Sequence, residues 1–174
     1  LIDLCNNKPH FKLISFRRNF GQTAAMSAGI KYAKGDIIIF MDADLQNDPA
    51  DIPALISKLN EGYDVVSGWR KNRKDKLLFK KIPSAIANFI IRKISKVNIH
   101  DLGCSLKAYR REILNEIYIY GEMHRFLPVI AARVGAKITE IPVNHKPRKY
   151  GKSHYGLNRT FKVLLDLITV QFMR

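Results

Sequence analysis

One stretch of sequence constrains the fold of this 174-residue chain more than any other. Asp36 is followed by five consecutive apolar residues, Ile37 to Met41, with no alternation between apolar and polar positions. A run of this kind is typical of a β-strand that is covered on both faces by helices. The sequence therefore predicts an α/β fold in which this strand is central.

The segments on either side alternate between strand-like and helix-like patterns, and no internal repeat interrupts them. This alternation predicts one α/β domain with a mainly parallel sheet flanked by helices. Gly35 is expected to close the first helix, and Pro49 stands where the next helix begins. The expected strands are 12–16, 36–41, 64–68, 106–109 and 137–143, and the expected helices are 22–33, 50–60, 82–96 and 125–134.

The charge of the chain points to an anionic partner. Lys and Arg number 30 against 15 Asp and Glu, a net charge of +15 at pH 7, which suits nucleic acid, a phospholipid surface or a phosphorylated small molecule. We expect no nucleic-acid partner, because basic and aromatic residues are not interleaved on a groove-sized surface and no nucleic-acid-binding motif is recognised. The basic run 70–81 is either a solvated face or a face for phosphate or lipid headgroups. Two cysteines, Cys5 and Cys104, do not suggest a disulfide framework or a zinc site.

Two carboxylates follow the apolar strand directly, at Asp42 and Asp44. In open α/β sheets ligands bind beyond the carboxyl ends of the strands, and carboxylates at i and i+2 can reach one divalent cation together with substrate oxygens. Oxygen ligands favour Mg²⁺ or Mn²⁺. The alternative is that both aspartates only cap the following turn, which is a common use of Asp in loops. The position after a fully apolar strand favours the metal site.

Five motifs occur in the order found in family 2 glycosyltransferases, and together they cover nearly the whole chain. The resemblance is closest to the branch of dolichol-phosphate mannosyltransferases and bacterial polyprenyl-phosphate glycosyltransferases, and it implies a GT-A-like, Rossmann-like fold. The motifs are Phe16–Gln22, Met41–Gln46 with Pro49, Gly62–Gly68 with Arg70 and Arg73, Asp101–Lys107, and Arg148–Tyr155.

The resemblance implies a role for each motif. Asp44 and Gln46 match positions that hold a divalent metal, and Asp42 matches a position near the nucleotide ribose and the metal. The loop beside the nucleotide corresponds to Arg18, Asn19 and Gly21. The positions matching those that grip the donor diphosphate and the acceptor phosphate are Arg70, Arg73, Arg148, Lys152, Ser153, His154 and Tyr155.

Asp101 and Arg148 match positions near the reaction centre. For Asp101, a positioning role, a cation-holding role, general-base catalysis and a plain turn position are all open. Glu122 stands roughly where other family 2 enzymes carry an acidic pair, although only one acid is present here. A phosphate acceptor is largely ionised at neutral pH, because its second pKa is about 6. The expected work of the enzyme is therefore positioning and stabilisation of the nucleoside diphosphate leaving group.

The function implied is metal-dependent, inverting transfer of one sugar from a UDP- or GDP-sugar to an undecaprenyl or dolichyl phosphate. We expect it at the cytoplasmic face of a membrane, on an anionic surface. Trp69 is the single tryptophan, so the Gln-x-x-Arg-Trp motif of processive synthases is not expected in its usual form. The alternatives are transfer to another lipid or glycan acceptor, and a catalytically inactive binding domain.

The chain also departs from the family pattern. The family's first strands, which carry Pro-x-Tyr-Asn-Glu-like and Asp-Asp-Gly-Ser-like motifs, have no counterpart. We therefore expect residues 1–174 to be one catalytic domain that lacks its N-terminal nucleotide-binding strands and any transmembrane helices. His154 stands where Lys is frequent, and it is either a pH-dependent phosphate contact or a surface residue. The apolar segment 157–174 is either core or an interfacial helix.

Overall fold

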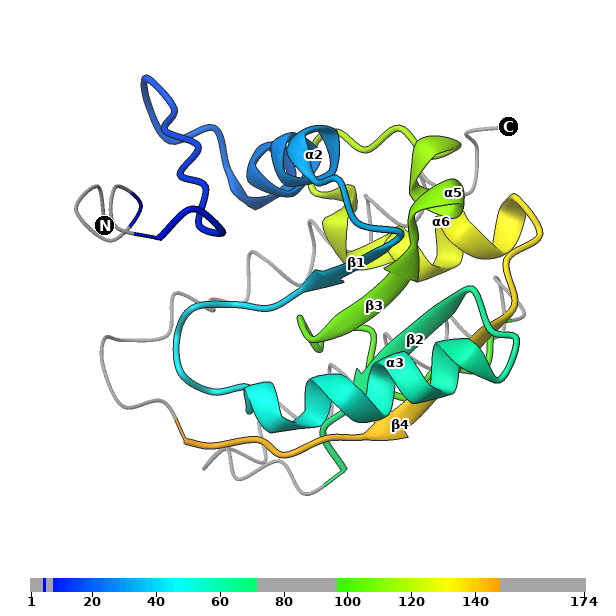
Figure 1. Cartoon of the computed structure of the whole chain (residues 1–174). Helices are drawn as coiled ribbons and strands as arrows, with labels where there is room; N and C mark the ends of the chain where they lie inside the picture. Colours follow the sequence, from blue (N-terminus) through cyan, green and yellow to red (C-terminus); the bar gives the residue numbers. More distant parts are fainter. Residues whose placement is uncertain (1–4, 6–7, 72–96, 148–174) are drawn as a thin grey trace, which may run out of the picture.

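The computed structural model describes residue 5 and residues 8–71 and 97–147 of the chain (Figure 1). The helix predicted at 82–96, the basic run beyond Lys71 and the C-terminal segment 157–174 lie outside these residues. A four-stranded sheet forms the centre, in the order β1-β3-β2-β4. Its strands are β1 (Ile37–Phe40), β2 (Val65–Trp69), β3 (Lys107–Arg110) and β4 (Ile138–Pro142).

The sheet is mixed, and the expectation of a mainly parallel sheet is wrong for the described strands. Strand β3 lies between β1 and β2 and runs antiparallel to both, whereas β2 and β4 are parallel. Hydrophobic patterning identifies a strand but carries no information on its direction, so the sequence could not show that β3 is reversed. Strands β1, β2 and β4 consequently end at one edge of the sheet, and β3 begins there.

Strand β1 is an edge strand among the described residues, not the central strand that its apolar run predicted. It pairs with β3 on one side only, and of its residues only Ile38 is buried. Both faces are nevertheless covered by helices: Ile38 packs in one hydrophobic cluster, while Ile37 and Ile39 pack against another. The apolar run therefore reports covered faces correctly and says nothing about the two edges.

The strand predicted at 12–16 is not formed. Residues 11–16 have no regular secondary structure, and the side chains of Phe11, Leu13 and Phe16 are exposed. Strand geometry requires a hydrogen-bonded neighbour, and no described segment pairs with this one. Its apolar pattern alone is therefore not sufficient to make it a strand.

Three of the predicted helices are present. Pro49 begins a 3₁₀ turn, and the Asp48 carboxylate accepts a hydrogen bond from the Ala50 amide at 3.1 Å, which caps that turn. The left-handed Gly62, with φ of +99°, follows the next helix. The short α5 was not predicted. The helical elements are α2 (Gln22–Tyr32), η1 (Pro49–Asp51), α3 (Ile52–Asn60), α5 (Arg111–Asn115), η2 (Met123–Phe126) and α6 (Leu127–Arg133).

Helices cover both faces of the sheet (Figure 1). Helix α3 lies on one face, and α2, α5 and α6 lie on the other. Neighbouring residues of β2 point to opposite faces, so that each hydrophobic cluster receives alternate strand residues. The first cluster includes Leu55, Leu59, Val66, Leu106 and Ala108, and the second includes Ile38, Val65, Tyr109, Leu114, Leu127 and Ala131. Among the described residues, no helix has the length and apolar character needed to cross a membrane.

Gly68 provides a test of this packing. A Cβ at Gly68 would lie 2.9 Å from the Leu106 carbonyl oxygen and 3.0 Å from both Cys104 Sγ and Val143 Cγ2. We expect Gly68→Ala to lower the free energy of unfolding by about 1–3 kcal/mol, because overpacking forces its neighbours apart. Gly29→Ala is the matched control: it has open space in α2 and should raise stability by about 0.5–1 kcal/mol. Urea unfolding of both variants measures the difference, and equal effects would contradict the close packing around Gly68.

Candidate active site

The candidate residues gather at the edge of the sheet where β1, β2 and β4 end and β3 begins. Asp42 follows β1, Arg70 follows β2, and the segment Asp101–Ser105 leads into β3. Figure 1 shows the loop after β1 and the segment after β4 extending to the same side of the molecule. The reversed β3 is what adds Asp101 to this edge, since the start of an antiparallel strand meets the ends of its neighbours.

The loop after β1, residues 41–48, carries the predicted metal ligands. Asp42 Oδ1 accepts a hydrogen bond from Gln22 Nε2 at 3.0 Å, and Asp44 Oδ1 accepts one from the Gln46 amide at 3.1 Å. Asp44 therefore does stabilise the turn, as the alternative interpretation expected. An ionised carboxylate has about four lone-pair positions, so the same group can also take part in binding a cation. Leu45 has φ of +64°, a left-handed conformation that is uncommon for a residue with a side chain.

The donor atoms of this loop fit a hard divalent cation. Asp42 and Asp44 contribute carboxylates, and Gln46 contributes an amide. In the part of the chain that the structure describes, no three His, Cys, Asp or Glu side chains form a group able to enclose a metal on their own. Mg²⁺ is commonly bound through one or two carboxylates together with substrate phosphates and water. The loop therefore suits Mg²⁺ or Mn²⁺ that binds together with a phosphorylated ligand.

Arg70 and Asp101 form a bidentate ion pair. Arg70 Nε donates to Asp101 Oδ2 at 2.7 Å and Nη2 donates to Oδ1 at 2.8 Å, while the Arg70 amide donates to Oδ2 at 3.3 Å. Trp69 stacks on His100 with ring centroids 4.7 Å apart. Two consecutive residues at the end of β2 thus hold two consecutive residues of the segment that leads into β3.

The environment of Asp101 favours its ionised form. Burial opposes ionisation, but the hydrogen bonds and positive charge of Arg70 outweigh it, and the pKa of Asp101 is lowered. The two side chains are 13% and 14% exposed, so little water separates them from this effect. A carboxylate held in this way can orient the guanidinium of Arg70, and it is a weak acceptor for a further proton.

Ser105 joins the segment before β3 to the loop after β1. Its Oγ accepts hydrogen bonds from Asn47 Nδ2 at 2.7 Å and from the Asp42 amide at 3.4 Å. Sequence reasoning did not select Ser105, Asn47 or Gln22. Ser105 does lie within the Asp101–Lys107 motif, which is the only indication that the sequence offers, because the partner of a loop serine depends on the fold.

The segment after β4 also meets the loop after β1. Lys146 donates its amide to the Gln46 carbonyl at 2.8 Å and accepts from Gln46 Nε2 at 3.3 Å, and its ammonium pairs with Asp48 at 2.9 Å. Gln46 thus uses its amide nitrogen, not its amide oxygen, in this contact. The chain reaches the candidate metal loop at Lys146, two residues before Arg148 in the sequence.

The predicted nucleotide loop begins α2. Asn19 Oδ1 accepts from the Gly21 amide at 2.8 Å, Gly21 has φ of +88°, and the Arg18 guanidinium lies over Phe20 at 4.7 Å. All three predicted residues are exposed. The hydrogen bond from Gln22 to Asp42 connects this loop to the candidate metal loop.

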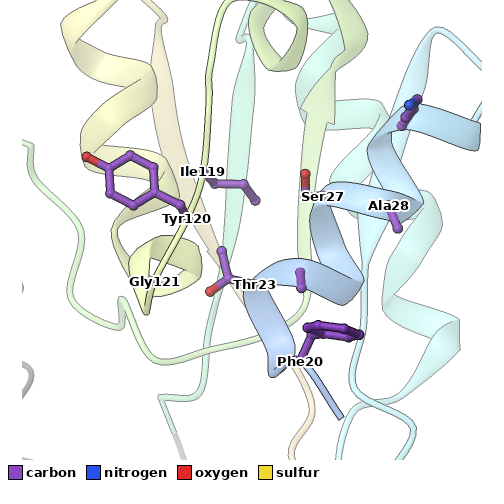
Figure 2. Close-up of a pocket in the computed structure, with 9 residues that line it drawn as sticks. Phe20, Thr23, Ser27, Ala28, Ile119, Tyr120 and Gly121 are labelled. Atoms are coloured by element: carbon purple, nitrogen blue, oxygen red, sulfur yellow. The ribbon is translucent and has the colours of Figure 1, made fainter. Parts of the chain in front are cut away.

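Several predicted residues lie outside the described part of the chain, and Glu122 lies apart from this edge. Glu122 precedes η2 and directly follows a pocket of about 470 Å³ between α2 and residues 119–121 (Figure 2). That pocket is lined by Phe20, Thr23, Ser27, Tyr120 and others, with none of the predicted site residues among them. Outside the described residues are Arg73, Arg148, Lys152, Ser153, His154 and Tyr155.

The Arg70–Asp101 pair generates a prediction for stability against pH. Asp101→Asn should lower the free energy of unfolding at pH 7 by about 2–3 kcal/mol, because Arg70 loses its charged partner. The pKa of Asp101 lies below its ordinary value of 3.8. The stabilisation is therefore complete above this value and is lost as the pH falls through the lowered pKa.

Urea unfolding of wild type and Asp101→Asn from pH 7 down to about pH 3 measures the effect. The difference in stability should be constant at the upper end and should shrink in the acid range. The exposed Asp36→Asn is the control and should show a small difference throughout. A wild-type advantage that stayed constant into the acid range would contradict a paired, ionised Asp101.

Comparison with known proteins agrees with this site. A family model described as "Glycosyl transferase family 2" matches residues 1–118. Dodecaprenyl-phosphate galacturonate synthase of Rhizobium johnstonii is 51% identical over 164 residues, covering 92% of this chain and 48% of that protein. Undecaprenyl-phosphate 4-deoxy-4-formamido-L-arabinose transferase of Salmonella paratyphi B is 42% identical over 160 residues, covering 92% and 49%. The chain spans about half the length of these curated relatives.

Solved structures confirm the expected GT-A-like fold. Glucosyl-3-phosphoglycerate synthase from Mycobacterium tuberculosis, crystallised with Mn²⁺, UDP and glucosyl-3-phosphoglycerate, superposes with a TM-score of 0.69 at 16% identity. The superposition covers 88% of this chain and 55% of that one. The family model matches more than half of the chain and the family's motifs lie together at one edge of the sheet. The chain therefore belongs to glycosyltransferase family 2.

Proposed function

We propose that the protein transfers a single sugar from a UDP- or GDP-sugar to a polyprenyl phosphate, in a metal-dependent reaction that inverts the anomeric carbon. The observation that carries this proposal is the arrangement of the Asp42–Asp44 loop and the Arg70–Asp101 pair at one edge of the sheet. Its support from relatives is that two of them, 51% and 42% identical, are named as enzymes acting with dodecaprenyl or undecaprenyl phosphate.

The donor diphosphate is the group that this edge suits best. Asp42, Asp44 and Gln46 would hold Mg²⁺ or Mn²⁺, which when bound offsets the charge of the diphosphate and of the departing nucleoside diphosphate. Arg70 adds a planar cationic fork whose orientation is set by Asp101. The loop with Arg18, Asn19 and Gly21 would lie beside the nucleotide, because Gln22 ties it to Asp42.

The acceptor phosphate would be bound by the segment Arg148–Tyr155. This proposal is supported by Lys146, since its contacts with Gln46 bring the preceding chain to the candidate metal loop. Cationic side chains are needed there because a diphosphate and a phosphate monoester repel each other. Arg148, Lys152, Ser153, His154 and Tyr155 supply positive charge and hydrogen-bond donors, together with Arg73 from the basic run.

The transfer itself needs little general-base assistance. An ionised acceptor phosphate oxygen attacks the anomeric carbon from the side opposite the diphosphate, the new carbon–oxygen bond forms, and the bond to the nucleoside diphosphate breaks with both electrons leaving on that group. No proton has to be removed from an acceptor that is already ionised. Asp101 therefore acts by orienting Arg70, and catalysis comes from alignment and charge stabilisation.

A membrane surface is the proposed location, at its cytoplasmic face. A polyprenyl phosphate resides in a membrane, and a net charge of +15 favours an anionic lipid surface. Transfer to another lipid or glycan is the alternative, which would leave the Arg148–Tyr155 segment without a role. A binding domain without turnover is the second alternative.

The metal loop is tested with Asp44→Ala. The full-length protein is assayed with a panel of UDP- and GDP-sugars, a short polyprenyl phosphate and Mg²⁺ or Mn²⁺. Transfer should depend on the metal and fall by about 100-fold in Asp44→Ala, because the cation loses a ligand. Glu61→Ala removes an exposed carboxylate of the same charge and should leave the rate unchanged. Transfer that persists in Asp44→Ala, or in excess chelator, would refute the metal-dependent proposal.

The acceptor is tested with Arg148→Ala. Loss of a charged phosphate contact should reduce kcat/KM for polyprenyl phosphate by about 10- to 100-fold, while nucleotide affinity is retained. Lys34→Ala removes one exposed positive charge and is the matched control. Unchanged kinetics in Arg148→Ala, with transfer to a different lipid or glycan, would favour the alternative acceptor.

A further inference from the structure

We infer that Lys107 is a positioning residue for this reaction: it holds the Asp101–Ser105 turn in the shape that connects the Asp42–Asn47 loop with the Arg70–Asp101 pair. The inference rests on the proposed function, because it names what keeps that same site in order. Lys107 is the first residue of β3, directly after the turn and one residue after Leu106.

The ammonium group of Lys107 is buried and bound to the turn. The residue is 5% exposed, and its Nζ donates to the carbonyl oxygen of Leu102 at 3.1 Å and to that of Cys104. Both acceptors belong to the same short turn. A buried ammonium is costly unless it is hydrogen-bonded, so the turn and the lysine each satisfy polar groups that the other would leave buried.

The two ends of this turn make the contacts that define the site. At one end, Asp101 receives both hydrogen bonds of the Arg70 guanidinium. At the other end, Ser105 Oγ accepts from the Asp42 amide and from Asn47 Nδ2. A change in the shape of the turn therefore moves the two halves of the site relative to each other.

The charge of Lys107 contributes as well as its hydrogen bonds. Burial lowers the pKa of Lys107, whereas the negative charges of Asp101 and Asp42 act to raise it and the positive charge of Arg70 to lower it. The ammonium is thus within electrostatic range of all three groups. As a cation it offsets two carboxylates that would otherwise repel each other and the phosphates of a donor.

The turn has little freedom to accommodate a different residue. A Cβ at Gly103 would lie 3.1 Å from Arg70 Nη2 and 3.5 Å from Asp101 Oδ1. Next in the turn, Cys104 is buried and its Sγ lies 3.9 Å from the Leu106 carbonyl oxygen. The turn is therefore packed against the ion pair, and its carbonyl oxygens face a single cation.

A purely structural role for Lys107 makes a different prediction from a positioning role. The hydrophobic cluster against α3 is filled by the neighbours of Lys107 in β3, Leu106 and Ala108, and not by Lys107. If Lys107 only stabilised the fold, its replacement would lower stability but leave the affinity and rate of each folded molecule unchanged. If it positions the site, affinity and rate change in the protein that is folded.

The test uses the full-length protein with Lys107→Met, which keeps most of the stem and removes the ammonium, and Lys107→Arg, which keeps the charge. Lys34→Met is the matched control for an exposed lysine. Urea unfolding gives the folded fraction. Binding of Mn²⁺ with UDP or GDP is followed by calorimetry and by the fluorescence of Trp69, the single tryptophan, and kcat and KM are measured separately.

We expect Lys107→Met to be folded, with binding of Mn²⁺ and nucleotide and kcat each weakened about 10-fold or more. Lys107→Arg should recover part of both, and Lys34→Met should match wild type. Binding and kcat within about twofold of wild type in folded Lys107→Met would overturn the inference.

Ser105→Ala keeps the inference falsifiable if Lys107→Met does not fold. It breaks the contact of the same turn with Asp42 and should weaken binding in the same direction; binding and kcat equal to those of wild type would overturn the inference. Absence of transfer in wild type, with nucleotide binding intact, would refute the proposed function alone, because the binding comparison still decides the role of Lys107.

Discussion

Strand β3 runs antiparallel to both of its neighbours, and the site depends on that direction. Because β1, β2 and β4 point one way, their ends meet at one edge of the sheet, and the reversed β3 brings its own start to the same edge. Asp42, Arg70 and Asp101 come from separate parts of the chain and are brought together by this single reversal. A fully parallel arrangement would have placed the Asp101–Ser105 turn at the opposite edge.

The edge is held together by polar contacts between loops. Gln22 binds Asp42, Ser105 binds the Asp42 amide and Asn47, and Arg70 grips Asp101. These contacts lie between groups that are partly or fully shielded from water, where hydrogen bonds to charged groups are strongest. The two hydrophobic clusters on either side of the sheet keep the strand ends still, and the polar contacts then set the distances between the functional side chains.

The balance of charge at this edge explains why a strongly basic chain can hold a carboxylate-rich site. Asp42, Asp44 and Asp101 lie beside Arg70 and the buried Lys107, so the acids and bases offset one another within the protein. A cation and a phosphorylated donor are then complementary to the loop carboxylates and to Arg70, respectively. The basic segments elsewhere in the sequence remain available for the acceptor phosphate and for the membrane surface that we propose.

The sequence by itself determined the positions of most described elements and the residue types of the site. The apolar run 37–41, the turn residues Pro49 and Gly62, and the carboxylates Asp42 and Asp44 are local patterns, and local patterns are sufficient for these predictions. The tertiary structure alone decided the reversal of β3, the edge position of β1, the failure of 12–16 to form a strand and the partnership of Arg70 with Asp101. It also decided that Ser105 and Lys107 serve the site. Each of these depends on which distant segments become neighbours, and such contacts leave no periodicity in a single sequence.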